Sequence, residues 1–193
     1  MTQQRDAGRH RADEYLLPWP VPEPPKVVVK RDLLPAVSVL STVALLGMAV
    51  GWLWSRLAPA QLSAVVEGGK YIPLRSESYH RFEDMVLFLL LSLAAGLITG
   101  VGVWMLRERR GPVMLLAATG GSALAAWLAT QVGVSWAQSR FAVTATPQLG
   151  DVIAIAPRLE SAWVVLAWPL ATALAYAVAA AWNGEMDLGR RLG

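Results

Sequence analysis

The longest stretch without a charged side chain is GPVMLLAATGGSALAAWLATQVGVSWAQS, residues 111–139, which lies between Arg110 and Arg140. It is 29 residues long. The hydrocarbon core of a bilayer is about 30 Å thick, and an α-helix needs about 20 apolar residues to cross it. Lipid offers the backbone no hydrogen bonds, so a crossing segment must pair its amides internally, as a helix does. The stretch therefore predicts a transmembrane helix.

Three further stretches lack Asp, Glu, Lys, Arg and His over 23, 22 and 24 residues: 33–55, 85–106 and 161–184. The composition agrees with a membrane protein, since 55% of the residues are hydrophobic and 16% are charged. In soluble domains, about 45–50% of the residues are hydrophobic and about 25% are charged. We predict an all-α membrane protein with four transmembrane helices near residues 33–55, 85–106, 113–135 and 162–182.

Several function classes are disfavoured by what the sequence lacks. The chain has no cysteine, which excludes disulfides and thiolate metal sites. The net charge is only +3, with charges of both signs, so the sequence lacks the strong basic excess that is typical of nucleic-acid-binding proteins. No Ser-nucleophile elbow, P-loop or zinc-protease motif is present. We therefore expect no enzyme and predict no catalytic, cofactor-binding or metal-binding residue.

Lys and Arg are distributed unevenly between the two sides of the predicted bundle. Eleven lie in the N-terminal segment, the turn at 107–110 and the C-terminal tail, whereas six lie in the long connections at 56–84 and 136–161. Basic residues mark cytoplasmic loops. We predict a multi-pass plasma-membrane protein with both termini cytoplasmic: a disordered, Pro-rich segment over 1–31, a membrane domain over 32–185 and a tail over 186–193.

Parts of the chain recur about 84 residues apart. Trp52, Arg56 and Pro73 align at this shift with Trp136, Arg140 and Pro157, and Glu67 aligns with Asp151. The pattern favours two tandem helix–β-hairpin–helix repeats, related by an axis along the membrane normal. Chance similarity between two apolar hairpins is the alternative.

Both long connections have the pattern of a β-hairpin. In the first, β-prone residues 62–67 and 70–72 flank Gly68-Gly69; in the second, residues 141–146 and 152–155 flank the turn Pro147–Asp151. Because a single hairpin is marginally stable in water, we expect the two to form one small extracytoplasmic β cap. The alternative is that both loops rest on the bilayer.

Small residues four positions apart mark close approach between transmembrane helices. This spacing occurs in each predicted span and is compatible with a four-helix bundle or with a homo-oligomer. The packing residues predicted from it are Gly47, Gly51, Gly96, Gly100, Gly121 and Ala125.

Charged residues of the outer connections are the candidate interaction residues: Arg56, Glu67, Arg75, His80, Glu83, Asp84, Arg140, Asp151 and Arg158. His80, Glu83 and Asp84 have the spacing of a cation or proton site, but they lack a second histidine. Acids that complement a helix N-terminus are the favoured interpretation. For the arginines, salt bridges between the cap and the helix ends are favoured over binding of anionic headgroups or a partner.

The chain also resembles actinobacterial membrane proteins of the domain of unknown function 2567 family. The resemblance covers about residues 30–185. It is carried by the basic, proline-rich N-terminus, Asp32-Leu-Leu-Pro35, Gly68-Gly-Lys-Tyr71, Arg107-Glu-Arg-Arg110 and the Ala/Trp-rich last span. It implies a plasma-membrane location and no established activity, so it assigns no functional residue.

These observations favour a non-enzymatic accessory or interaction subunit of the membrane. Its expected partners are the lipid bilayer and a membrane protein or further copies of the chain. The alternative is a small transport protein that works as an oligomer. The spans contain no ionisable mid-membrane residue, which argues against an ion-coupled carrier.

Overall fold

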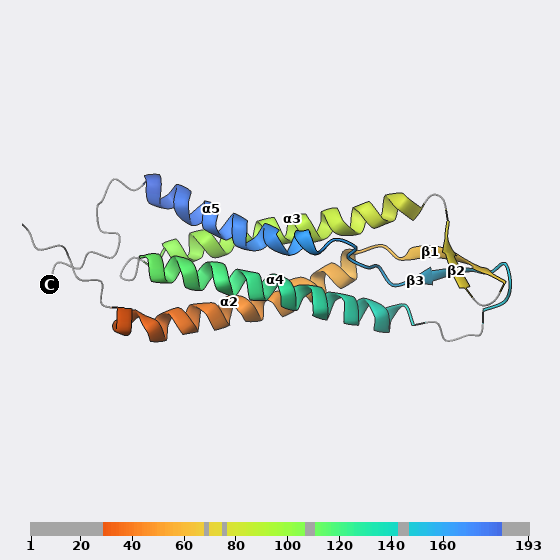
Figure 1. Cartoon of the computed structure of the whole chain (residues 1–193), viewed down its shortest axis with the longest axis horizontal. Coiled ribbons are helices and arrows are strands. Elements are labelled where there is room, and N and C mark those ends of the chain that lie inside the picture. Colours follow the sequence, from red (N-terminus) through yellow and green to blue (C-terminus); the bar gives the residue numbers. More distant parts are fainter. Residues whose placement is uncertain (1–28, 68–69, 75–76, 107–110, 143–146, 183–193) are drawn as a thin grey trace, which may run out of the picture. The chain divides into compact units, whose positions relative to one another are not determined.

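The computed structural model describes residues 29–67, 70–74, 77–106, 111–142 and 147–182, all within one unit of the chain, Val28–Gly189. The four long helices are α2 (Val29–Leu57), α3 (Glu77–Trp104), α4 (Pro112–Arg140) and α5 (Ala167–Trp182). A 3-10 helix, η3 (Ala162–Leu166), leads directly into α5. Within this unit, α2 begins and α5 ends at one end of the bundle, and the strands lie at the other (Figure 1).

Four helical segments are long and apolar enough to cross a membrane. They are Leu33–Leu57, Phe82–Trp104, Pro112–Arg140 and Ala162–Trp182. The helices differ in extent from the charge-free runs, because a helix can continue into water beyond its apolar segment. For example, α3 begins at Glu77, eight residues before the predicted span.

The fourth apolar segment is not one uniform α-helix. Its first five residues, Ala162–Leu166, form η3, and α5 begins only at Ala167. Pro169 lies in the first turn of α5. An amide in the first turn has no intrahelical acceptor, so the missing N–H of proline costs no hydrogen bond there.

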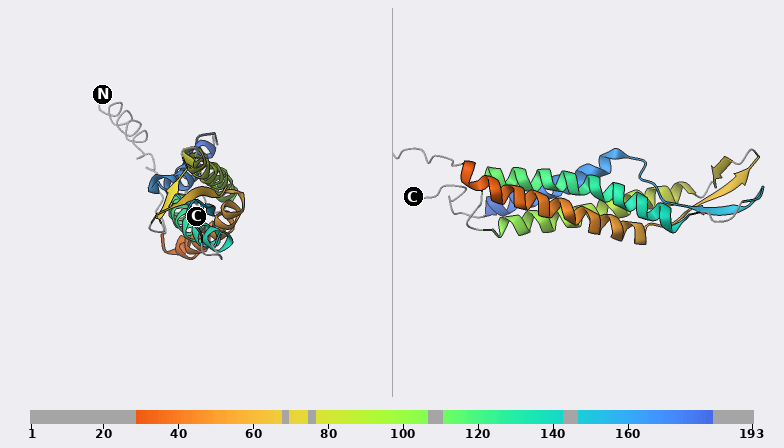
Figure 2. Two further views of the ribbon diagram at one scale, coloured as in Figure 1. Left: turned by 90° about the vertical axis from the view of Figure 1, so that its right-hand side faces the viewer. Right: turned by 90° about the horizontal axis from the view of Figure 1, so that it is seen from below.

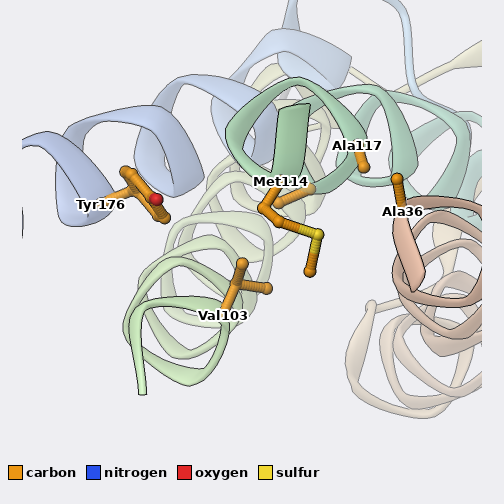
Figure 3. Close-up of a cluster of buried hydrophobic side chains, with 6 residues drawn as sticks. Ala36, Val103, Met114, Ala117 and Tyr176 are labelled. Atoms are coloured by element: carbon orange, nitrogen blue, oxygen red, sulfur yellow. The ribbon is translucent and has the colours of Figure 1, made fainter. Parts of the chain in front are cut away.

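The helices associate as two pairs of helices that run in the same direction. The most extensive contacts join α2 to α4 and α3 to α5, and α4 also contacts α5. Figure 1 shows α2 and α4 running toward the strands while α3 and α5 run away from them. Buried side chains fill the centre in three clusters. One cluster, drawn in Figure 3, includes Ala36, Val103, Met114, Ala117 and Tyr176.

A three-stranded sheet lies beyond the ends of α2 and α4 (Figure 2). Its strands are β1 (Gln61–Val66), β2 (Lys70–Pro73) and β3 (Val152–Ile155), in the order β2-β1-β3. Both pairings are antiparallel, and Ala64 lies opposite Ile72 on one side and Val152 on the other. The first loop thus forms the predicted hairpin, and the second loop adds a strand to it. Residues 143–146, most of the other predicted strand, lie outside the described residues.

Candidate functional sites

Glycines bring the backbones of α2 and α4 into direct contact. Gly47 faces the backbone of Ala125 so closely that a Cβ atom would overlap its carbonyl oxygen. A Cβ on Gly51 would lie 2.5 Å from the carbonyl oxygen of Ala129, and one on Gly121 would lie 2.9 Å from that of Leu40. Real Cβ atoms essentially never approach within 3.0 Å of another heavy atom. The small residues are therefore a steric requirement of this pair.

The α3–α5 pair uses glycine in the same way. A Cβ on Gly96 would lie 2.6 Å from the carbonyl oxygen of Trp168, and one on Gly100 would lie 2.6 Å from that of Thr172. All four predicted packing glycines of α2 and α3 thus lie at contacts between helices of a single chain. Gly102, by contrast, faces open space.

Buried polar groups connect α3, α4 and α5 at the centre of the bundle. The hydroxyl oxygens of Ser122 and Thr172 are 2.8 Å apart, and the Thr172 hydroxyl donates to the carbonyl oxygen of Gly96 at 3.2 Å. Trp168 Nε1 donates to Thr99 Oγ1 at 3.4 Å. Ser122 and Thr172 are fully buried. Their hydrogen bonds satisfy groups that would be costly to leave unpaired away from water.

Asp84 joins the sheet to the two helix pairs. The residue is fully buried, and its Oδ2 accepts a hydrogen bond from Gln61 Nε2 of β1 at 3.1 Å. Its backbone carbonyl oxygen accepts a hydrogen bond from Trp54 Nε1 of α2 at 3.0 Å. The Trp54 ring meets Phe88 edge to face, with centroids 6.2 Å apart. One residue at the start of α3 therefore fixes α2, α3 and β1 relative to one another.

The acidic cluster predicted at the start of α3 is divided by the helix. Glu83 is exposed whereas Asp84 is buried, so the two adjacent carboxylates point to different surroundings. The side chain of His80 lies outside the described residues. Within the part of the chain that the structure describes, no three His, Cys, Asp or Glu residues form a group that could hold a metal ion.

The structure brings Arg56 and Arg140 together at the sheet end of the bundle. Arg140 Nη1 donates to the carbonyl oxygens of Ser55 at 3.2 Å and of Arg56 at 3.1 Å. These are carbonyls of the last turn of α2, which have no intrahelical donor. Arg140 thus caps α2 from the end of α4. Among the described residues, the hydrogen-bond partners of Arg140 are backbone oxygens, and salt bridges between the cap and the helix ends remain a prediction for the other arginines.

The other candidate residues lie around the sheet. Glu67 follows β1 and Asp151 precedes β3, and the amide of Val65 donates to the carbonyl of Asp151 at 2.9 Å, so both acids lie at the same end of the sheet. The Asp151 carboxylate accepts the Gln148 amide at 2.8 Å, which closes the turn before β3. Arg158 is exposed after β3, and Arg75 lies outside the described residues.

One face of the sheet is mostly apolar and partly exposed. Lys70, opposite Val66, places one exposed charge at the end of this face. Antiparallel partners share a face, so the register places Leu62, Ala64 and Val66 of β1 on the same face as Ile72 and Val152. Leu62, Ile72 and Val152 are 39%, 53% and 57% exposed. We call this set of five residues the apolar sheet face.

The opposite face of the sheet carries the polar residues of β1 and is covered along β1, whereas Tyr71 of β2 on that face is 48% exposed. Gln61 and Ser63 are both buried there. The sequence analysis did not single out Gln61, because a polar residue that alternates with apolar ones in a strand is normally on the solvent side. The alternation of polar and apolar residues in β1 indicates that the strand has two different faces. Only the fold shows which of them is covered.

Comparison with known proteins identifies the family. The sequence profile of the family described as "Protein of unknown function (DUF2567)" matches residues 43–190. The chain is 34% identical over 178 residues to "Uncharacterized protein ML1222" of Mycobacterium leprae (strain TN). The aligned region covers 81% of this chain and 88% of the relative. No solved structure matches the chain. The expected resemblance is confirmed, and this four-helix membrane protein belongs to the DUF2567 family.

Proposed function

We propose that the protein is a non-enzymatic interaction subunit of the plasma membrane, which presents its three-stranded sheet on the extracytoplasmic side to a protein partner. The apolar sheet face carries this proposal. Apolar residues exposed together, outside the segments that can cross the membrane, are typical of a surface that another molecule covers. The sequence also lacks the motifs of the common hydrolases and nucleotide-binding enzymes, which favours binding over catalysis.

The placement of the apolar side chains strengthens the argument. In a sheet that simply faces water, the exposed side of β1 would carry the polar residues. Here Leu62 is exposed and Ala64 and Val66 are half-buried, whereas Gln61 and Ser63 are buried. The more exposed side of β1 is therefore the less polar of the two, as expected for a docking surface.

The connection to the bundle would hold this surface in a fixed position. Gln61 at the start of β1 is bonded to Asp84, and Ala58, Phe88 and Ala156 are buried together just below the sheet. A surface that is ordered before binding loses less conformational entropy when a partner docks. The junction therefore suits recognition better than a loose pair of loops would.

The orientation follows from charge. The start of α2, which follows the basic N-terminal segment in the sequence, and the end of α5 lie at one end of the bundle, and the sheet lies at the opposite end (Figure 1). Basic segments favour the cytoplasmic side. The sheet is then extracytoplasmic.

The same account includes a tandem duplication of helix, outer loop and helix. Under it, α2 corresponds to α4 and α3 to α5, and these are the helices that pair most extensively. Equivalent helices meet in this way around an axis along the membrane normal. The contact of Arg140 with the carbonyl of Arg56, its counterpart 84 residues earlier, supports the same correspondence.

A site-specific photo-crosslinker at Ile72 tests the proposed function. Ile72 lies in the apolar sheet face, and the matched control position is Met105, which is 72% exposed at the other end of α3. After irradiation of cells, we expect Ile72 to give a discrete adduct with one other membrane or envelope protein, identified by mass spectrometry. The replacements Leu62→Ser and Val152→Ser should weaken this adduct, and Met105 should not form it.

The result that would contradict the proposal is equally specific. If Ile72 crosslinks only to lipid or only to a second copy of the chain, the sheet is not a docking surface for a different protein. An adduct between copies would instead favour the alternative, a transport protein that acts as an oligomer.

A further inference from the structure

The sequence Trp-x-x-x-Arg occurs at the sheet end of two neighbouring helices. Trp52 and Arg56 stand in the last turns of α2, and Trp136 and Arg140 stand in the last turns of α4. Residues four apart lie on the same face of a helix. Each helix therefore ends with an aromatic side chain and a cation on one face.

The structure brings the guanidinium group of Arg140 to the backbone of Arg56. Arg140 Nη1 bonds the carbonyl oxygen of Arg56 at 3.1 Å, while the Arg56 guanidinium lies over the Trp52 ring, 5.6 Å from its centroid. The Arg140 guanidinium lies 5.1 Å from the centroid of Phe141. Both arginines are exposed, and each guanidinium carries five N–H donors, so most donors of the pair face outward.

Neither arginine of this pair has an acidic neighbour nearby in the sequence. Arg56 is the only ionisable residue between Asp32 and Glu67, and Arg140 is the only one between Arg110 and Asp151. Among the described residues, the recorded contacts of both guanidinium groups are with backbone carbonyls and aromatic rings. Two like charges held together favour the binding of an anion.

The position of the two arginines along the helices indicates which kind of anion they would bind. Arg56 and Arg140 lie at the ends of the apolar segments Leu33–Leu57 and Pro112–Arg140, where a bilayer gives way to its headgroups. Trp52 and Trp136 are 42% and 54% exposed one turn earlier, as expected for tryptophans at the membrane interface. Trp54, two residues from Trp52, is instead fully buried in the core.

We propose that Arg56 and Arg140 together bind the phosphate of an anionic phospholipid headgroup, with Trp52 and Trp136 against its glycerol and upper acyl chains. A guanidinium matches phosphate oxygens with paired N–H donors. A pair of cations also disfavours the ammonium of a zwitterionic headgroup, so the site selects phosphatidylglycerol over phosphatidylcholine. The proposal holds whichever side of the membrane this end faces, so it is independent of the proposed function.

Native mass spectrometry of the purified full-length protein tests the site. The probe is an equal mixture of phosphatidylglycerol and phosphatidylcholine added in detergent, and the readout is the ratio of bound to free phosphatidylglycerol. We expect Arg56→Gln to lower this ratio about fivefold and Arg56→Gln with Arg140→Gln to lower it about twenty-fivefold, since each basic residue near an anionic surface contributes about one such factor. Lys70→Gln, which removes an exposed charge from β2, should leave it unchanged.

Arg56→Gln is the decisive variant because the Arg56 side chain, among the described residues, contacts the Trp52 ring of its own helix, whereas Arg140 bonds the end of α2. An unchanged thermal midpoint for this variant shows that its lipid loss is not loss of fold. The proposal is overturned if Arg56→Gln retains phosphatidylglycerol as the wild type does, or if Lys70→Gln loses it equally. Displacement of the lipid by millimolar inorganic phosphate would assign the pair to a free anion instead.

Discussion

The two helix pairs of this protein are held together by different chemistry. The α2–α4 contact is formed by Gly47, Gly51 and Gly121 against the backbone of the partner helix. The α3–α5 contact uses Gly96 and Gly100 in the same way, but buried hydroxyl and indole groups are added to it. The α2–α4 pair thus relies on close van der Waals approach along its length and has hydrogen bonds at the sheet end, where Arg140 caps α2. The α3–α5 pair combines close approach with buried hydrogen bonds at its centre.

The difference shows how a bundle can become specific in a solvent that gives its helices no hydrophobic drive to associate. Small-residue stripes allow close approach but fit many partners, since each helix carries one. The hydrogen bonds are directional. Ser122 of α4 bonds Thr172 of α5, so the polar groups also connect the second pair to the first. The hydroxyls therefore select the partner and register, while the glycines supply the packing.

The largest effect should come from blocking the α2–α4 contact. Gly47→Leu places a side chain where the Ala125 backbone lies, so the helices must separate. We expect the free energy of unfolding to fall by about 3 kcal/mol or more, which is at the upper end of the cost of overpacking a protein interior. The measurement is the fraction of monodisperse protein on size-exclusion chromatography in mild detergent.

Gly102→Leu is the matched control. Gly102 lies in α3, and a Cβ there meets nothing within 4 Å. This variant should elute as the wild type does. If Gly47→Leu also elutes like the wild type, then α2 and α4 do not associate through the close backbone contact at Gly47.

A smaller effect is expected at Asp84, which contacts both pairs. Asp84→Ala leaves the buried Gln61 amide without its acceptor, which costs about 2 kcal/mol for an unsatisfied buried group. Asp84→Asn keeps an oxygen acceptor and should cost less, and Glu67→Ala, at an exposed site, should cost almost nothing. Unfolding by a denaturing detergent measures all three; equal loss in Asp84→Ala and Glu67→Ala would show that the junction does not stabilise the bundle.

The smallest effect should come from the hydrogen bonds of the α3–α5 pair. Thr172→Val keeps the side-chain shape but removes the hydroxyl that Ser122 and Gly96 share, at a cost of about 1 kcal/mol in a membrane bundle. The matched control is Thr130→Val, because the Thr130 hydroxyl bonds only its own helix, at Trp127 O. The same unfolding assay should separate the two variants. Equal stability would assign no pairing role to the Thr172 hydroxyl.

Much of the architecture follows from where charges are absent. The four charge-free runs predict the four helices, because a charge-free run long enough to cross lipid has one stable conformation there. The Gly68-Gly69 pair likewise predicts the turn between β1 and β2. The helix ends are less predictable: α4 runs on to Arg140, since residues outside lipid can stay helical.

The pairing of elements could not be predicted from local sequence. Every helix carries a small-residue stripe, so the stripes do not specify that α2 meets α4. Asp84 has the sequence context of an exposed acid at a helix N-terminus, and its burial depends on Trp54 and Gln61, which are 30 and 23 residues away. Such long-range contacts leave no local pattern.

Cysteine labelling of intact cells tests whether the sheet lies outside the membrane and the termini lie inside. The chain contains no cysteine, so Leu149→Cys in the exposed turn before β3 and Gly189→Cys in the tail each introduce a single thiol. A membrane-impermeant maleimide applied to intact cells should modify Leu149→Cys, and it should modify Gly189→Cys only after permeabilisation. Labelling of Gly189→Cys in intact cells, with Leu149→Cys protected, would contradict the account.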